Sequence, residues 1–187
     1  MGENMNTYKL KLLDLERDLP IISISDKLDI ASFVILGDTE LVEKAAAELA
    51  AHLPPEIEYL VCPEAKAIPL VHSIATKKDL NYIVLRKSIK AYMKDYVVEE
   101  VRSITTTEPQ KLVINGVDIE KIKGKKVAVI DDVVSTGGTI SAAENLLRRI
   151  GTDVVWQGTI LWETDDLNAE YPQLFYIQKL PLFYKNK

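Results

Sequence analysis

Apolar and polar residues alternate along the chain in two patterns. Short runs of apolar and β-branched residues, typical of buried strands, occur at 57–62, 82–85, 111–114, 126–130, 154–161 and 174–180. Apolar residues at helical spacing predict helices over 38–52, 65–78 and 138–150. Asp38 stands where it can cap the first helix, and Gly151 follows the last. Strands that alternate with helices predict an α/β fold with parallel strands and helical crossovers.

Two segments depart from this alternation. Residues 1–37 are the least regular part, where 7–18 predicts a short helix that Pro20 stops and 21–24 predicts a strand. Residues 86–111 are polar, lysine-rich and weakly periodic, which predicts a long mobile insertion of the kind that often forms an active-site lid. No repeat, low-complexity tract or linker divides the chain, so we expect one domain over 1–187.

Composition narrows the possible classes of function. The 187 residues are 47% hydrophobic and 27% charged, with a net charge of −5. An acidic chain is not expected to bind nucleic acid or a membrane surface. The single cysteine, Cys62, cannot form an internal disulfide, and no signal peptide or membrane-spanning stretch is evident. We therefore expect a cytoplasmic protein.

The strongest candidate for a functional site is the segment 127–139. An apolar strand is expected to end at Asp131 and Asp132, and a Ser-Thr-Gly-Gly-Thr loop leads into the next helix. Ligands of open α/β sheets bind at the carboxyl ends of strands, where a glycine turn and a helix N-terminus favour phosphate. The acidic pair suits sugar hydroxyls or hydrated magnesium. Simple helix capping is the alternative, but it does not require two adjacent acids and two glycines.

This segment resembles the phosphoribosyl-diphosphate (PRPP) motif of the type I phosphoribosyltransferases, in their purine, adenine phosphoribosyltransferase-like branch. The resemblance covers roughly residues 38–165 and implies a parallel five-stranded sheet flanked by helices, with a small hood from residues 1–37 and a lid from 86–111. It implies that Asp131 and Asp132 hold the ribose hydroxyls as catalytic residues. The implied 5′-phosphate loop consists of Val134, Ser135, Thr136, Gly137, Gly138 and Thr139.

Two further segments resemble pyrophosphate-binding parts of the family. Glu64, Ala65 and Lys66 follow a predicted strand and are similar to a Glu-Ala-Arg loop, with lysine in place of the planar arginine. Arg86, Lys87 and Lys90 follow the next strand, and three cations at a strand end suit a polyphosphate. Read alone, the first segment is equally consistent with a solvated helix start. A charge run such as the second is usually a solvated face, but its position at the same sheet edge as the other two loops favours the binding role.

The resemblance also implies a reaction. PRPP and a nitrogenous base give a nucleoside monophosphate and pyrophosphate, with Mg²⁺ held mainly through PRPP and water, so that no all-protein metal site is expected. The lid excludes water from the activated ribose, and Glu99 and Glu100 are its candidates for proton handling. Family members usually form dimers, which predicts a homodimer.

The resemblance leaves open which purine is the substrate and whether the protein is an enzyme or a regulator. Adenine is favoured narrowly as the purine, because a segment precedes the core where adenine and xanthine enzymes carry their hood. Hypoxanthine/guanine and xanthine phosphoribosyltransferases remain alternatives. A PRPP-sensing regulator with the same fold and no catalysis is the rival from another class, although the chain is acidic and short of a DNA-binding domain.

Overall fold

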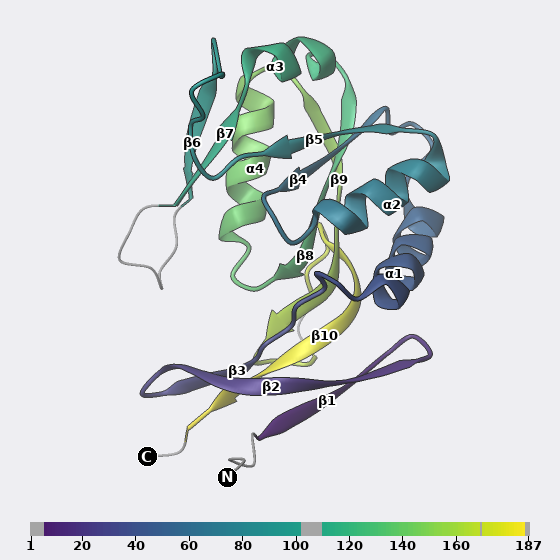
Figure 1. The fold of residues 1–187 in the computed structure, drawn as a ribbon, viewed down its shortest axis with the longest axis vertical. Coiled ribbons are helices and arrows are strands. Elements are labelled where there is room, and N and C mark those ends of the chain that lie inside the picture. The colour runs from purple at the N-terminus through teal and green to yellow at the C-terminus, as the bar shows by residue number, and fades with distance from the viewer. Residues whose placement is uncertain (1–5, 102–109, 169, 186–187) are drawn as a thin grey trace.

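The computed structural model describes residues 6–101, 110–168 and 170–185. Its main sheet has the strand order β1-β2-β3-β10-β9-β8-β4-β5 (Figure 1). The parallel part runs from β10 to β5, and it consists of β10 (Phe175–Tyr184), β9 (Asp153–Thr164), β8 (Lys126–Val134), β4 (Tyr59–Pro63) and β5 (Asn81–Leu85). The predicted parallel five-stranded sheet is therefore confirmed.

Helices cover both faces of this parallel sheet. Helices α1 (Thr39–His52) and α2 (Ile68–Lys78) pack on one face, and α4 (Gly138–Arg149) packs on the other (Figure 1). A short helix that the sequence pattern did not predict, α3 (Gly116–Ile122), precedes β8. None of the described helices combines the length and the apolar character needed to cross a membrane.

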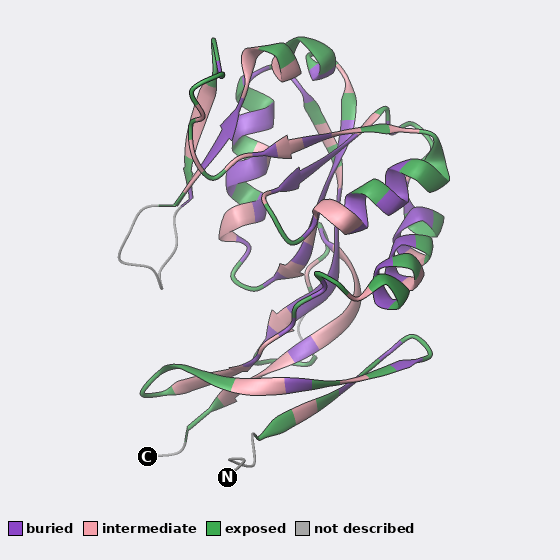
Figure 2. Ribbon diagram, viewed as in Figure 1, coloured by how far each residue is buried: buried purple, intermediate pink, exposed green. Residues whose placement is uncertain are grey.

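Two layers of core residues lie on opposite faces of the sheet. In β8, Ala128 and Ile130 join the layer beneath α1 and α2, while Val127 and Val129 join the layer beneath α4. This alternation is the period of two that an extended strand imposes. The middle parts of the central strands are buried, while the helices expose their outer faces (Figure 2). Hydrophobic burial on both faces explains why these strands read as continuous apolar runs.

The predicted helix over 7–18 is wrong. Residues of this segment form β1 (Thr7–Leu12) and the start of β2 (Leu15–Ser25), which pair as an antiparallel hairpin. The apolar positions recur every second residue in β1, so Leu10 and Leu12 are buried while their neighbours face solvent. Pro20 lies within β2 where its ladder with β1 ends, so its missing N–H removes no pairing from the centre of the ladder. The strand predicted at 21–24 is confirmed as part of β2.

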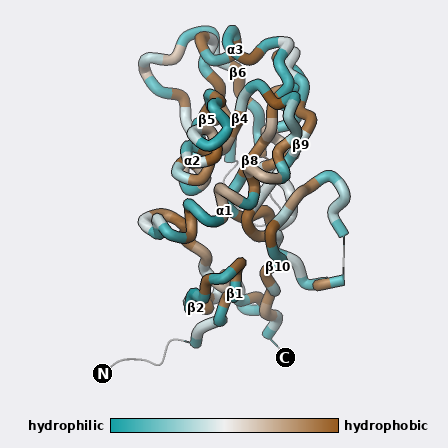
Figure 3. The backbone as a smooth tube through the Cα atoms, turned by 90° about the vertical axis from the view of Figure 1, so that its right-hand side faces the viewer, coloured by the Kyte–Doolittle hydropathy of each residue, from teal (hydrophilic) through white to brown (hydrophobic). Residues whose placement is uncertain are grey.

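The hairpin and β3 (Leu28–Ala31) form the hood as an antiparallel extension of the sheet. β3 pairs with β2 on one side and with the end of β10 on the other. Figure 3 shows this extension at one end of the molecule, below α1. The hood is therefore joined to the core through continuous sheet pairing.

The segment 86–111 contains regular structure that its composition did not predict. β6 (Val97–Val101) pairs with β7 (Gln110–Ile114) in a separate two-stranded sheet that packs against α4. The strand predicted at 111–114 thus exists but does not belong to the main sheet. Residues 102–109, in the middle of the predicted lid, lie outside the described residues.

Candidate functional site

Strand β8 carries the acidic pair to the edge of the site. The strand continues through Asp131 and Asp132 to Val134, so the expected end of the strand at the two acids is wrong. Pairing with β9 explains the extension, because Asp131 lies opposite Thr159 and Val134 lies opposite Trp162. The loop 135–137 then connects β8 directly to α4.

Asp132 and Lys66 meet although 66 positions separate them in the chain. The side chain of Asp132 is buried, and its Oδ2 accepts no hydrogen bond from the described residues. Lys66 Nζ lies 3.4 Å from this oxygen as an ion pair without hydrogen-bond geometry. A buried carboxylate oxygen in this state has free capacity for a hydroxyl donor or a hydrated cation.

Asp131 is held by a backbone hydrogen bond, and its carboxyl has a raised pKa. Its Oδ1 accepts the backbone N–H of Asp132 at 2.9 Å. Burial raises the pKa of the Asp131 carboxyl, and the neighbouring charge of Asp132 raises it further. Two adjacent carboxylates in a poorly solvated position favour a ligand that supplies donors or positive charge.

The loop after β8 encloses a candidate phosphate site. It lines a cavity of about 140 Å³, and the lining residues are Val101, Gln110, Asp131, Val133, Val134, Ser135, Thr136, Gly137, Gly138, Thr139 and Ile140. Gly137 has a φ of +78°, which favours glycine, and a Cβ there would also displace the Tyr171 hydroxyl, 2.9 Å away. Helix α4 begins at Gly138 without a side-chain cap. Its free N–H groups and dipole suit an anion.

The two basic segments come together around Glu64. Its Oε2 accepts the backbone N–H of Lys87 at 3.0 Å and lies 3.0 Å from Arg86 Nε. The hydrogen bond from Lys87 and the charges of Arg86 and Lys90 lower the pKa of Glu64. The Glu64–Ala65 peptide bond is cis. Lys90 Nζ donates to Ser88 Oγ at 2.6 Å.

The two lid acids are placed elsewhere. Glu99 forms an ion pair with Arg149 at 3.0 Å, and Arg149 also donates to the Val98 carbonyl. Both Glu99 and Glu100 line a second cavity along α4, which shares Gly138 with the cavity at Asp131 and the loop 135–137. The described structure therefore does not bring them to the acidic pair.

Glu163 is a site residue that the sequence pattern did not reveal. The predicted strand 154–161 stops short of it, whereas β9 continues to Thr164. Burial raises the pKa of Glu163, against the opposing effects of the Ser135 hydroxyl and the Lys66 charge. Glu163 reaches the site because β9 extends beside the extended β8, and the apolar run of β9 alone does not indicate that extension.

The donor set fits Mg²⁺ only as a partner of a ligand. Asp131 and Asp132 offer hard oxygen ligands, and one of their oxygens lacks a hydrogen bond. No group of three or more acidic, histidine or cysteine residues within the described ranges could enclose a metal ion. Such an arrangement suits an ion held by one or two carboxylates together with phosphate and water.

The chain is similar to proteins of one known family. The model of the phosphoribosyl transferase domain matches residues 36–170. A hypoxanthine/guanine phosphoribosyltransferase of Methanococcus maripaludis (strain C6) is 32% identical over 128 residues, covering 67% of this chain and 64% of the relative. One of Methanothermobacter thermautotrophicus is 35% identical over 119 residues, covering 64% and 58%. This chain thus matches less than two thirds of the length of these relatives.

The fold agrees with solved structures. Adenine phosphoribosyltransferase from Rhodothermus marinus superposes with a TM-score of 0.66 at 20% identity, covering 93% of this chain and 94% of that one. Likeness at this identity shows the fold, with its parallel sheet between helices. Together with the match over 36–170, it shows that the chain belongs to the phosphoribosyl transferase domain family.

Proposed function

We propose that this protein is a purine phosphoribosyltransferase, which transfers the 5-phosphoribosyl group of PRPP to a purine and releases pyrophosphate, as in purine salvage. The observation that carries the proposal is the position of Asp131 and Asp132, between the cavity of the loop 135–139 and the cation of Lys66. A phosphorylated sugar diphosphate has the same order of groups, with a phosphate, hydroxyls and a diphosphate.

Each part of the site has a role in this reaction. The Asp131 and Asp132 carboxylates orient the ribose hydroxyls, and the loop and the N-terminus of α4 hold the 5′-phosphate. The positive charge of Lys66 stabilises the negative charge that develops on the leaving pyrophosphate, and Arg86, Lys87 and Lys90 add to this stabilisation. Mg²⁺, when bound, neutralises the diphosphate. The segment 86–111 excludes water from the reacting carbon, which would otherwise be hydrolysed.

The comparisons also guide the choice of the purine substrate to propose. The relatives that are 32% and 35% identical are named as hypoxanthine/guanine enzymes, whereas the likeness to adenine enzymes is one of fold at 20% identity. We therefore propose a 6-oxopurine as the first substrate to test, and adenine, which the sequence pattern favoured narrowly, as the second. A homodimer and a cytoplasmic location stay predictions.

The test is pyrophosphate release from PRPP and Mg²⁺ with adenine, hypoxanthine, guanine, xanthine, uracil and orotate offered separately. We expect release with hypoxanthine or guanine. Release should be lost in the isosteric double variant Asp131→Asn/Asp132→Asn and kept in Asp153→Asn, an exposed acid at the opposite end of β9.

Two outcomes contradict the proposal. Unchanged release in a folded double variant would exclude the acidic pair as the site. No release with any of the six bases, together with PRPP binding by calorimetry, would replace the transferase by a PRPP-sensing regulator.

A further inference from the structure

We propose that Glu163 accepts the proton that the purine loses when its ring nitrogen bonds to the ribose. This inference rests on the proposed function and adds a catalytic residue to it.

The strand order indicates where the base must lie. Strand β8, with Asp131 and Asp132, stands between β4 and β9 in the sheet. The loop after β4 carries Lys66, so the pyrophosphate side of the ribose is the β4 side. The 5′-phosphate occupies the loop before α4, and the remaining side of the ribose faces the carboxyl end of β9.

The register brings Glu163 to that side. Val134 pairs with Trp162, so the next residues, Ser135 and Glu163, lie abreast at the ends of the two strands. Trp162 joins the layer beneath α4, so the next residue, Glu163, points to the opposite face, on the side of α1 and α2. Lys66 immediately precedes α2 on that face, which explains why its charge acts on both Asp132 and Glu163.

The chain that connects β3 to α1 carries exposed apolar side chains. Val34 and Leu36, which lie between β3 and α1, are 56% and 48% exposed, a large fraction for branched aliphatic residues. Figure 1 shows this connection passing the carboxyl ends of β8 and β9. We place the purine between this connection and Glu163, because a flat aromatic ligand suits apolar side chains on one side and a carboxylate on the other.

The other carboxylates near the site have partners or a role already. Asp131 accepts the Asp132 N–H and is assigned to the ribose hydroxyls in the proposed function. Asp132 is paired with Lys66, and Glu64 is paired with Arg86 and the Lys87 N–H. Glu99 is paired with Arg149. Within the described part of the chain, Glu163 has no ion pair closer than 4 Å, although it is only partly exposed. Its raised pKa makes it a better proton acceptor than an exposed carboxylate, because general bases work best near the operating pH.

The step balances with groups that the reaction itself supplies. The lone pair of the purine nitrogen forms the bond to the anomeric carbon, and the carbon–oxygen bond to pyrophosphate breaks with its electron pair leaving on oxygen. The proton carried by the imidazole ring of the purine passes to the Glu163 carboxylate and then to water.

The experiment compares Glu163→Gln with Glu120→Gln, a matched change at an exposed residue of α3, at the opposite end of the molecule (Figure 1). Steady-state pyrophosphate release is measured against pH at saturating PRPP and purine, and PRPP affinity is measured by calorimetry. We expect Glu163→Gln to lower kcat about 100-fold or more while the PRPP affinity stays the same. The acidic limb of the wild-type kcat profile should disappear, because it reports ionisation of Glu163. Glu120→Gln should behave as wild type.

A second variant guards against a purely structural effect. Glu163→Asp keeps a carboxylate, so it should retain an acidic limb at a reduced kcat. Wild-type kcat with an unchanged acidic limb in Glu163→Gln would overturn the inference, and so would a loss of PRPP affinity in both variants. If the wild-type protein binds PRPP but transfers no base, the proposed function fails and the inference fails with it. An active wild type with an unaffected Glu163→Gln removes the inference alone.

Discussion

The surroundings of Asp131 destabilise its charged form in the unliganded protein. Its carboxyl is buried beside that of Asp132, and both effects raise its pKa. Cys62, on neighbouring β4, is buried as the sequence predicted, and burial and the charge of Asp131 raise the pKa of its thiol. Ionised Asp131 therefore costs stability, which a ligand bound to its carboxylate would recover, as proteins commonly trade stability for function.

Replacing Asp131 by Asn should therefore stabilise the unliganded protein at neutral pH. The raised pKa means that protonated Asp131 favours the folded state. This contribution is complete below the unfolded pKa of about 3.9 and is lost as pH rises through the folded pKa. Asparagine stays neutral and can still accept the Asp132 N–H.

The free energy of unfolding of both proteins should be measured by denaturant titration between pH 4 and pH 8. The advantage of Asp131→Asn should grow as pH rises. An advantage that shrinks toward neutral pH would show that the wild-type carboxyl is not destabilised by ionisation.

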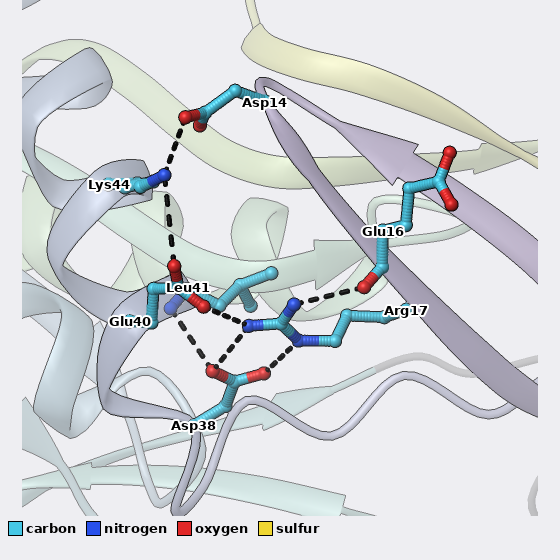
Figure 4. A network of polar contacts seen from close by, with 7 residues as sticks. All are labelled: Asp14, Glu16, Arg17, Asp38, Glu40, Leu41 and Lys44. Atoms are coloured by element: carbon cyan, nitrogen blue, oxygen red, sulfur yellow. Dashed lines mark hydrogen bonds and ion pairs between the residues drawn. The ribbon is translucent and has the colours of Figure 1, made fainter.

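The hood and α1 are connected by one polar network, which Figure 4 shows. Arg17 of β2 donates to both oxygens of Asp38, at 2.6 and 3.1 Å, and to Glu40 at 3.0 Å. Asp38 also caps α1 by accepting the Leu41 N–H at 3.1 Å, as the sequence predicted. Lys44 connects Glu40 to Asp14 in the turn of the hairpin. The sequence identified the cap, but it could not identify an ion pair that spans 21 residues.

Asp38→Ala should lower the free energy of unfolding by about 1–2 kcal/mol, because it removes a helix cap and leaves Arg17 without its bidentate partner. Lys44→Ala, which breaks more exposed pairs, should cost less than about 1 kcal/mol. Arg17 is the main cause of the lowered pKa of Asp38, so the stability from this carboxylate is present above the unfolded pKa and lost as pH falls through the folded pKa.

A double-mutant cycle of Arg17→Ala and Asp38→Ala measures the pair itself. Additive effects of the two changes would show that the cap alone accounts for the loss.

At the scale of the whole molecule, the site exists only in the folded chain. Segments around residues 64, 86, 131 and 163 contribute to it, and they meet because the carboxyl ends of parallel strands share one edge of the sheet. PRPP should therefore bind the folded protein and not the unfolded chain.

This linkage predicts that PRPP with Mg²⁺ raises the Tm, with about 2.7 kcal/mol of added stability at a free PRPP concentration of 100 Kd. Differential scanning fluorimetry with increasing PRPP checks the prediction. Lys66→Met, which removes a charge at the proposed pyrophosphate side, should reduce the shift, whereas Lys125→Met, at the amino end of β8 and away from the carboxyl ends, should not. An equal shift in both variants would remove Lys66 from the PRPP site.

The sequence by itself determined the alternation of strands and helices, the parallel sheet and the glycine loop before α4, because periodicity, helix caps and glycine turns are local properties. It misassigned 7–18 because a short segment with apolar residues fits either period until pairing with β2 selects the strand. Tertiary structure decided where β8 and β9 end, and with them the positions of Asp131 and Glu163, because mutual pairing extends both strands beyond their apolar runs. It also decided that Lys66 lies against Asp132, since contacts between distant loops depend on the strand order and have no local signature.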